Sequence, residues 1–336
     1  MEEASALFAQ RFQRLRDAMG QVIVGQQEAL DGILTCLVAD GHVLLEGVPG
    51  LGKTLMVRTL AQAVGLDFAR IQFTPDLMPA DIIGTHIINE DEKGGRSLRF
   101  EAGPVFTQVL LADEINRATP KTQSAMLESM QERQVTVAGV RRPLPVPFFV
   151  LATQNPLEME GTYPLPEAQL DRFFYKVLVP FPNLDELVQI VDRTTGNETA
   201  ESPKGVELDE LLEMRSVVRE VPVAEPVKRY AMRLVLATHP DSRHAAETTK
   251  RFVRYGASPR AAQTLILAAR VHALLDGRIN VSFDDVRAVA LPAMRHRLIR
   301  NFEGEAEGIE PDEIVTKVVA EVPELTREVA REATQA

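Results

Sequence analysis

The chain has 336 residues, of which 45% are apolar and 25% charged, and it carries 48 acidic against 37 basic side chains. This length and composition are typical of about two folded domains. The net charge of −11 argues against nonspecific binding to nucleic acid or to anionic lipid as the main task of the protein.

The chain opens with a segment of amphipathic helical pattern. Phe8, Phe12, Leu15 and Met19 recur at helical spacing, which predicts a leading helix that ends at Gly20. The acidic start is unlike a signal peptide, and no apolar run approaches the roughly 18 residues of a membrane span. We therefore expect a cytoplasmic protein without a membrane segment.

A second helix is predicted after the apolar stretch of residues 22–26. Val24 and Gly25 in this stretch form either a wall beside an adenine base or a plain corner before the helix. Cys36 lies within the helical pattern and is the only cysteine, which excludes an intramolecular disulfide. We interpret it as a small buried apolar side chain.

The most informative stretch is GVPGLGKT at residues 47–54, which follows an apolar strand pattern and precedes an apolar helical pattern. Its glycines allow the backbone N–H groups to turn inward around an anion. Lys53 adds a charge for the terminal phosphates, and the Thr54 hydroxyl is a ligand for Mg²⁺. The stretch is therefore a P-loop, with the predicted nucleotide-binding residues Gly47, Val48, Pro49, Gly50, Leu51, Gly52, Lys53, Thr54 and Leu55.

After a second strand at residues 68–73, the pattern departs from simple alternation of strands and helices. Residues 74–103 are predicted to contain a short helix near 77–83, a strand at 85–89, a charged turn at 90–95 and a strand at 98–100. Insertions of this size between core elements are usually functional or flexible. A surface hairpin without function is the alternative.

Asp113 and Glu114 end a fully apolar strand, at the edge where open parallel sheets bind ligands. We expect Asp113 to hold the water shell of Mg²⁺, and Glu114 to accept a proton from the water that attacks the γ-phosphate. Two acids at a strand end are common as a helix cap, but their position some sixty residues after a P-loop favours catalysis.

Further candidates follow in chain order. A helix is predicted at residues 120–131, a hairpin at 135–145 with its turn at Ala138 and Gly139, and a strand at 148–153 that ends near Asn155. We expect Asn155 to orient water, although an Asn before Pro also forms turns. Arg172 lies near the end of a short helical segment at residues 165–174, where a solvated arginine at a helix end is the alternative to a functional role. A last strand is predicted at 177–179.

Pro180 and Pro182 mark a change in composition, after which helical patterns follow one another at 184–194, 207–219, 226–238, 259–275 and 282–299. Ser258, Pro259 and Arg260 form a helix start. The helix dipole disfavours a cation there, so Arg260 indicates a nearby anion.

Together these motifs resemble the AAA+ ATPases, and within them the MoxR family, over residues 22–297. The stretches that carry the resemblance are GVPGLGKT at 47–54, LADEINR at 111–117, TQSAMLESMQERQVTV at 122–137, ATQNP at 152–156, EAQLDRF at 167–173 and SPR at 258–260. The resemblance implies an α/β P-loop core at residues 1–182 with a parallel sheet, followed by a small all-α lid at residues 183–336. It identifies residues 74–103 with the helix-2 insert and 135–145 with the pre-sensor-1 hairpin.

The same resemblance implies specific roles. Lys53 and Thr54 correspond to Walker A, and Asp113 and Glu114 to Walker B. The resemblance implies sensor 1 for Asn155, an arginine finger that reaches a neighbouring subunit for Arg172, and sensor 2 for Arg260. Arg117 resembles a charged position near the subunit interface.

The function implied is an ATP- and Mg²⁺-dependent, chaperone-like remodelling ATPase. It would act as a homo-oligomeric, hexameric ring with a von Willebrand factor A domain partner on a protein client. Two alternatives stay open. Arg133, Arg141 and Arg142 would suit a nucleic-acid translocase, although the net charge of −11 opposes it. A nucleotide-gated switch with little turnover would need neither Glu114 nor Arg172.

Overall fold

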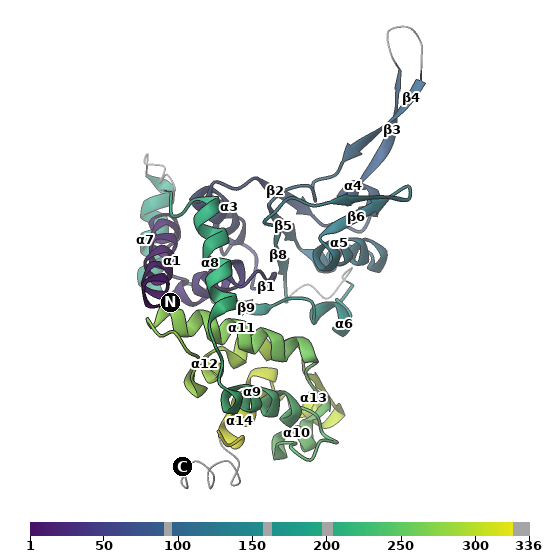
Figure 1. Ribbon diagram of the computed structural model, residues 1–336. Helices are drawn as coiled ribbons and strands as arrows, with labels where there is room; N and C mark the ends of the chain where they lie inside the picture. Colours follow the sequence, from purple (N-terminus) through teal and green to yellow (C-terminus); the bar gives the residue numbers. More distant parts are fainter. Residues whose placement is uncertain (91–95, 157–162, 197–203, 325–336) are drawn as a thin grey trace.

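The computed structural model describes residues 1–90, 96–156, 163–196 and 204–324 (Figure 1). Its centre is a five-stranded sheet in the order β2-β5-β8-β1-β9, and all neighbouring strands are parallel. The strands are β1 Val43–Glu46, β2 Phe68–Gln72, β5 Val109–Asp113, β8 Phe149–Gln154 and β9 Tyr175–Leu178. This confirms the predicted parallel α/β core.

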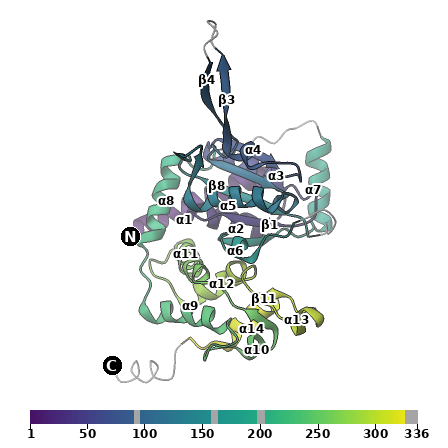
Figure 2. The same ribbon diagram turned by 90° about the vertical axis from the view of Figure 1, so that its right-hand side faces the viewer.

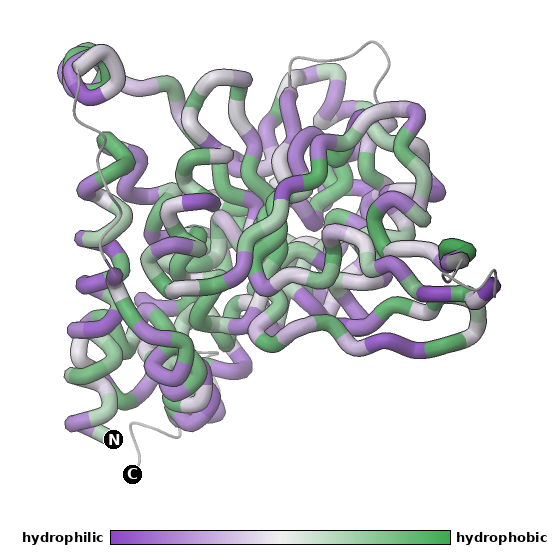
Figure 3. Tube along the Cα trace, turned by 90° about the horizontal axis from the view of Figure 1, so that it is seen from above, coloured by the Kyte–Doolittle hydropathy of each residue, from purple (hydrophilic) through white to green (hydrophobic). Residues whose placement is uncertain are grey.

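The central strands are apolar at almost every position because both faces of the sheet are covered. Val43, Leu45 and Leu111 contribute to the core that holds α1 (Glu2–Val22), α2 (Gln27–Val38) and α3 (Lys53–Val64). Leu44 and Leu110 point to the other face, where α4 (Pro79–Ile83), the short helix η1 (Ile115–Arg117) and α5 (Pro120–Glu132) pack. Viewed from above, many of the hydrophobic stretches run through the middle of the molecule (Figure 3).

Two antiparallel hairpins extend from the α5 side. The longer one, β3 (Gly84–Glu90) with β4 (Arg96–Ala102), projects away from the body, and residues 91–95 of the predicted charged turn lie outside the described residues (Figures 1 and 2). The shorter one pairs β6 (Gln134–Val137) with β7 (Val140–Pro143). Ala138 and Gly139 both have positive φ, 50° and 79°, as the predicted two-residue turn requires.

A side-chain pair lies between the two hairpins. The guanidinium of Arg142 on β7 lies over the ring of Phe100 on β4, 3.7 Å from its centroid. Phe100 also meets His86 and Phe106 edge to face. This cation–π contact joins the β3–β4 hairpin to the β6–β7 hairpin.

In its described residues, 183–196 and 204–324, the C-terminal part is helical apart from one small strand pair. Its elements are α7 Leu184–Thr195, α8 Leu208–Glu220, α9 Glu225–Ala237, α10 Glu247–Phe252, β10 Val253–Tyr255, α11 Pro259–Leu275, α12 Phe283–Met294, β11 Ile299–Arg300, α13 Phe302–Ala306 and α14 Pro311–Glu321. The end of this part that contains α10, α13 and α14 lies opposite the long hairpin (Figure 2).

The first helices after residue 182 pack on the α/β part. Helix α8 contacts α1, where Glu210 pairs with Arg11 at 3.3 Å and Arg14 at 2.6 Å, and its Arg215 pairs with Asp40 at 2.6 Å. A boundary at residue 183 therefore stays a prediction, because α8 shares its core with the preceding domain.

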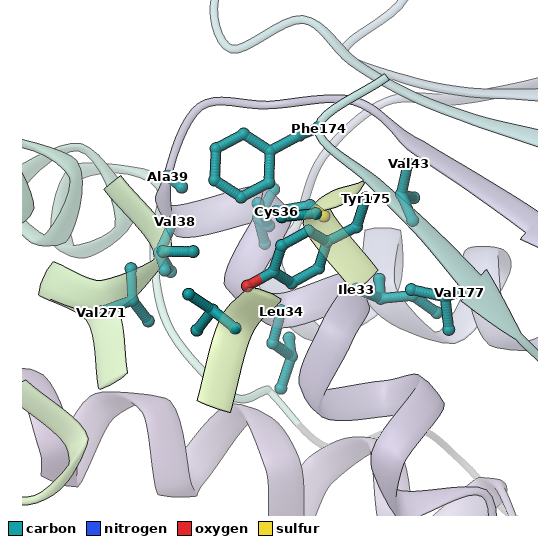
Figure 4. Packing of buried hydrophobic residues seen from close by; sticks show 14 of the residues in the cluster. Ile33, Leu34, Cys36, Val38, Ala39, Val43, Phe174, Tyr175, Val177 and Val271 are labelled. Carbon is teal, nitrogen blue, oxygen red and sulfur yellow. The ribbon is translucent and has the colours of Figure 1, made fainter. Parts of the chain in front are cut away.

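Helix α11 also reaches the α/β core. Val271 lies beside Leu34 and Val38 of α2, next to the ring of Tyr175 on β9 (Figure 4). Cys36 is fully buried in the same cluster, which confirms its interpretation as a small apolar side chain, and burial raises its thiol pKa well above the ordinary value.

The predicted elements differ from the structure mainly at the C-terminal end. Helix α12 ends at Met294 and not at residue 299, and the short elements α10, β10, β11 and α13 were not predicted. The short helical segment expected at 165–174 is only α6 (Glu167–Leu170). Within the described ranges, none of the helices combines the length and the apolarity that crossing a bilayer requires.

Candidate active site

The P-loop connects β1 to the first turn of α3. Gly50 and Gly52 adopt φ of 86° and 76°, in the region that only glycine enters freely. Gly52 is the N-cap of α3, and no side chain makes a capping hydrogen bond there. The first N–H groups of this helix and the positive end of its dipole therefore suit an anion.

Lys53 lies at the first position of α3 and is half-buried. Its ammonium donates hydrogen bonds to the carbonyls of Gly47 at 2.5 Å and Val48 at 3.0 Å, so these two residues position the lysine. Burial lowers the pKa of Lys53, while Asp113 and Glu114 act in the opposite direction.

Asp113 and Glu114 are held together by a threonine on the neighbouring strand. The Thr153 hydroxyl donates to Oδ1 of Asp113 at 2.6 Å and accepts the backbone N–H of Glu114 at 2.8 Å. Glu114 takes a left-handed conformation with φ of 57°, a strained choice for a residue other than glycine. The backbone therefore turns sharply between the two acids, so their carboxylates meet different partners.

Three further side chains surround the acids. Gln72 on β2 donates from Nε2 to Oε2 of Glu114 at 2.6 Å, and Arg117 lies 3.2 Å from the same oxygen. Arg70, also on β2, donates to Oδ2 of Asp113 at 2.7 Å. Arg117, which the sequence suggested for the subunit interface, thus contacts Glu114 of its own chain.

A cavity of about 440 Å³ is lined by the predicted nucleotide-binding residues 49–55, whereas Gly47 and Val48 do not line it. Thr54 and Asp113 offer a hydroxyl and a carboxylate oxygen to this space, the ligand type that Mg²⁺ takes, so these residues fit the predicted metal site. The full lining is Pro49, Gly50, Leu51, Gly52, Lys53, Thr54, Leu55, Arg70, Asp113, Glu114, Thr153 and Asn155.

A second, more apolar cavity of about 340 Å³ lies beside the P-loop. Val22, Ile23 and Val24 line one side, and Leu187 and Ile190 of α7 line another. This is the position expected for an adenine wall, so Val24 stays a candidate for base contact.

Gly25 does not line that cavity. It has φ of 63°, and a Cβ there would lie 2.0 Å from Oε1 of Glu186, so the glycine allows α7 to approach closely. This packing agrees with the alternative of a corner before the helix, and nucleotide contact by Gly25 stays a prediction.

Arg172 lies outside the phosphate cavity. It follows α6, and its Nη1 donates to the carbonyl of Leu127 on α5 at 2.9 Å. It lines two other cavities, one beside α5 with Glu128 and Glu132, and one of about 210 Å³ shared with Arg260. Helices α5 and α3 cover opposite faces of the sheet.

Arg260 lies in the first turn of α11, as the sequence predicted, but beside Arg172. Its guanidinium approaches Asp171 at 3.3 Å and Gln131 at 3.3 Å. It is not among the residues that line the phosphate cavity. The role of Arg260 at a nucleotide therefore stays a prediction.

Sequence reasoning did not single out Arg70, Gln72 or Thr153. Their contacts depend on strand register: Gln72 lies opposite Asp113, and Thr153 follows the Ala112–Ala152 pair on the other side of β5. The sequence signal for these contacts is a polar residue at the end of each of the two strands that flank β5, namely Gln72 on β2 and Thr153 on β8.

Comparisons with known proteins agree with this geometry. Residues 42–175 match the ATPase family associated with various cellular activities (AAA), and residues 245–318 match the AAA lid domain. Chaperone MoxR1 of Mycobacterium tuberculosis is 44% identical over 90% of this chain and 79% of its own length. Protein MoxR of Paracoccus denitrificans is 35% identical over 90% of this chain and 93% of its own length.

A solved structure shows the same fold. It is that of a candidate ATPase from Cytophaga hutchinsonii, with a TM-score of 0.88 and 42% identity over 96% of this chain and 97% of that chain. The P-loop, the paired acids and the lid occur together in this chain in the arrangement described above. The chain therefore belongs to the MoxR family of AAA ATPases and hydrolyses ATP.

Proposed function

We propose that this ATPase hydrolyses ATP at sites shared between neighbouring copies in a ring. One copy supplies the P-loop and the two Walker B acids, and the next copy supplies Arg172 and Arg260. The observation that carries the proposal is that both arginines line one cavity, while neither lines the phosphate cavity of its own chain. A head-to-tail contact that closes into a ring would bring the two cavities together.

Within one copy, each polar residue has a separate task. Lys53 and the N-terminal amides of α3 bind the β- and γ-phosphates. Thr54 and Asp113 would hold Mg²⁺, which neutralises phosphate charge when bound. Glu114 accepts the proton of the attacking water, and Asn155 orients that water.

Two neighbouring side chains hold the carboxylate of Glu114, the proposed proton acceptor. Gln72 and Arg117 both contact Oε2 of Glu114 and leave Oε1 as the oxygen for the attacking water. Gln72 and Arg117 therefore hold the carboxylate of Glu114 from the same side.

The neighbouring copy supplies charge that the site lacks. An arginine at the developing negative charge typically adds about 10³ to 10⁵ in rate. A copy without a neighbour would therefore bind ATP but turn it over slowly. Arg172 and Arg260 line one cavity. The surface that carries them, which one copy would present to the nucleotide of its neighbour, is called the donating face, and it holds two cations.

The use of the hydrolysis energy is proposed from relatives. One relative carries the name chaperone, which supports a chaperone-like remodelling role on a protein client. A hexameric ring, a von Willebrand factor A domain partner and a cytoplasmic location are proposed on the same resemblance. The hairpin β3–β4, with Ile88 and Leu98 exposed at 69% and 72%, offers apolar contact area far from the nucleotide.

Two of the three arginines that suited the nucleic-acid alternative make contacts within the chain. Arg133 pairs with Asp40 at 2.8 Å, and Arg142 lies over the ring of Phe100. Only Arg141 of this group is exposed without a contact of that kind among those described. The net charge of −11 points the same way.

The shared-site proposal is tested by dilution. ATP hydrolysis per subunit is measured over a wide range of protein concentration while light scattering reports the mass of the particles. We expect hydrolysis per subunit to fall as particles dissociate, with ATP binding retained. A rate per subunit that is the same for separated copies and for assemblies would contradict the proposal.

A further inference from the structure

Asp171, the residue before Arg172, is the meeting point of three side chains from the C-terminal part. Arg297 donates from Nε to Oδ1 at 2.9 Å. The Ser258 hydroxyl lies 2.7 Å from both carboxylate oxygens, and Arg260 donates to Oδ2 at 3.3 Å. One carboxylate thus joins the segment that carries Arg172 to the start of α11 and to the turn after α12.

Arg297 holds the backbone on both sides of Arg172. Its Nη2 donates to the carbonyls of Asp171 at 3.2 Å and Phe173 at 2.6 Å. Its Nη1 donates to the carbonyl of Phe174 at 3.3 Å and also contacts that of Ala293. The Arg297 side chain is only 2% exposed, so these hydrogen bonds lie in the interior, whereas Arg260 at 44% reaches the surface. Buried charged hydrogen bonds of this kind fix geometry strongly.

This hydrogen-bond network bears on the positions of both cations of the donating face, Arg172 and Arg260. Asp171 binds Arg260 directly and lies next to Arg172 in the chain. Without an acid between them, two arginines that line one cavity would repel each other. The carboxylate also bonds to both Arg297 and Ser258, so a movement of the start of α11 is transmitted to the segment that carries Arg172.

We propose that Asp171 is a positioning residue, which clamps the lid to the arginine-finger segment and presents Arg172 and Arg260 as one unit to the neighbouring copy. This proposal rests on the shared-site function above. It predicts that loss of the carboxylate damages the face a copy donates and leaves that copy's own nucleotide site intact.

The test uses full-length Asp171→Asn in mixtures with two other variants. Lys53→Ala has a damaged P-loop and an intact donating face, whereas Arg172→Ala has the reverse. We expect Asp171→Asn alone to bind ATP with unchanged affinity but to turn over about 10- to 100-fold more slowly, as for a displaced catalytic group. Adding Lys53→Ala should restore activity, and adding Arg172→Ala should not.

A matched control separates positioning from lid stability. Asp285→Asn removes another buried carboxylate of the same part, which pairs with Arg278 at 2.5 Å and His272 at 2.7 Å, away from Arg172. It should lower the unfolding temperature and leave the turnover of the folded protein unchanged. If Asp285→Asn slows turnover as much as Asp171→Asn does, the effect is one of lid stability and the proposal is wrong.

A second variant covers the case in which Asp171→Asn does not fold because Arg297 is left buried without its partner. The double variant Asp171→Asn with Arg297→Met removes both charges. It should fold and behave in mixtures as a copy with a damaged donating face. Turnover equal to that of the unmodified protein would overturn the proposal.

The failures of the two proposals are distinguishable. If mixtures of Arg172→Ala and Lys53→Ala show no recovery, the shared site itself is wrong. If those recover but Asp171→Asn with Lys53→Ala does not, Asp171 has another role and the shared site stands.

Discussion

The hydroxyl of Thr153 donates to the carboxylate of Asp113 at 2.6 Å, from the neighbouring strand of the sheet. The same oxygen accepts the backbone N–H of Glu114 at 2.8 Å. Since Thr153 is 1% exposed, water cannot replace it. One buried hydroxyl therefore sets the positions of both Walker B acids.

Replacing Thr153 by valine keeps the shape and removes the hydroxyl. The N–H of Glu114 would lose its acceptor, which should cost about 1–3 kcal/mol in the free energy of unfolding. We expect turnover to fall about tenfold or more, because the acids shift relative to the phosphates. Thr153→Ser is the matched control and should retain most of the turnover. Equal turnover in the Val and Ser variants would show that the hydroxyl does not position the acids.

Glu114→Gln tests the proton acceptor. The amide has the shape of the carboxylate but cannot take a proton, so turnover should drop about 10²- to 10⁴-fold while ATP binding persists. The control is Glu313→Gln on α14, which loses only an exposed ion pair with Lys317. Turnover close to that of the unmodified protein would require another base.

Lys53→Ala tests the P-loop. Loss of the ammonium should weaken ATP binding about 10- to 100-fold, because a hydrogen bond to a charged group contributes about 1.5–3 kcal/mol. Binding is measured by calorimetry with ATP. Lys317→Ala, an exposed lysine of α14, serves as the control and should bind normally. Unchanged affinity in Lys53→Ala would remove the phosphate-binding role.

Because His42 is buried, we predict that the free energy of unfolding decreases in acid. Its Nδ1 accepts the N–H of Val150 and its Nε2 lies 3.1 Å from the carbonyl of Met130, so the folded state holds the neutral ring. Burial lowers its pKa from 6.5 to about 4. The unfolded chain binds the proton first, so stability is full above about pH 6.5 and falls as the pH drops toward 4.

The size of this effect follows from the linkage between proton binding and folding. At pH 5, His42 should cost roughly 2 kcal/mol of the free energy of unfolding relative to neutral pH. Urea unfolding at both pH values measures it, and His42→Gln, which does not titrate, should reduce the difference by that amount. The same pH dependence in both proteins would assign the acid sensitivity elsewhere.

Much of the site could be predicted because its signals are local. The P-loop is one continuous stretch in which Gly50 and Gly52 must adopt positive φ, and Asp113 ends a strand whose apolar run is visible in the sequence. Thr153 and Gln72 could not be found in this way. Their contacts follow from which strands are neighbours and in what register, and neither is encoded in a short stretch.

Arg260 shows that the packing direction of a whole helix, like strand register, cannot be predicted from a short stretch of sequence. Its position at the start of α11 is a local property, and the Ser258 N-cap bond to its N–H at 3.1 Å confirms it. The direction in which α11 leaves the α/β core depends instead on packing against α1, α2 and α12. The start of the helix was therefore predicted correctly, whereas the sequence alone does not give the side of the molecule on which it lies.

The measurement that tests the shared site most directly is a mixture of Lys53→Ala with Arg172→Ala subunits, each inactive alone. At equal amounts roughly a quarter of the sites should regain a P-loop from one copy and an arginine from the next. We predict ATP hydrolysis that rises to a maximum near this ratio. Hydrolysis that stays at the level of the separate variants at every ratio would contradict a site built from two copies.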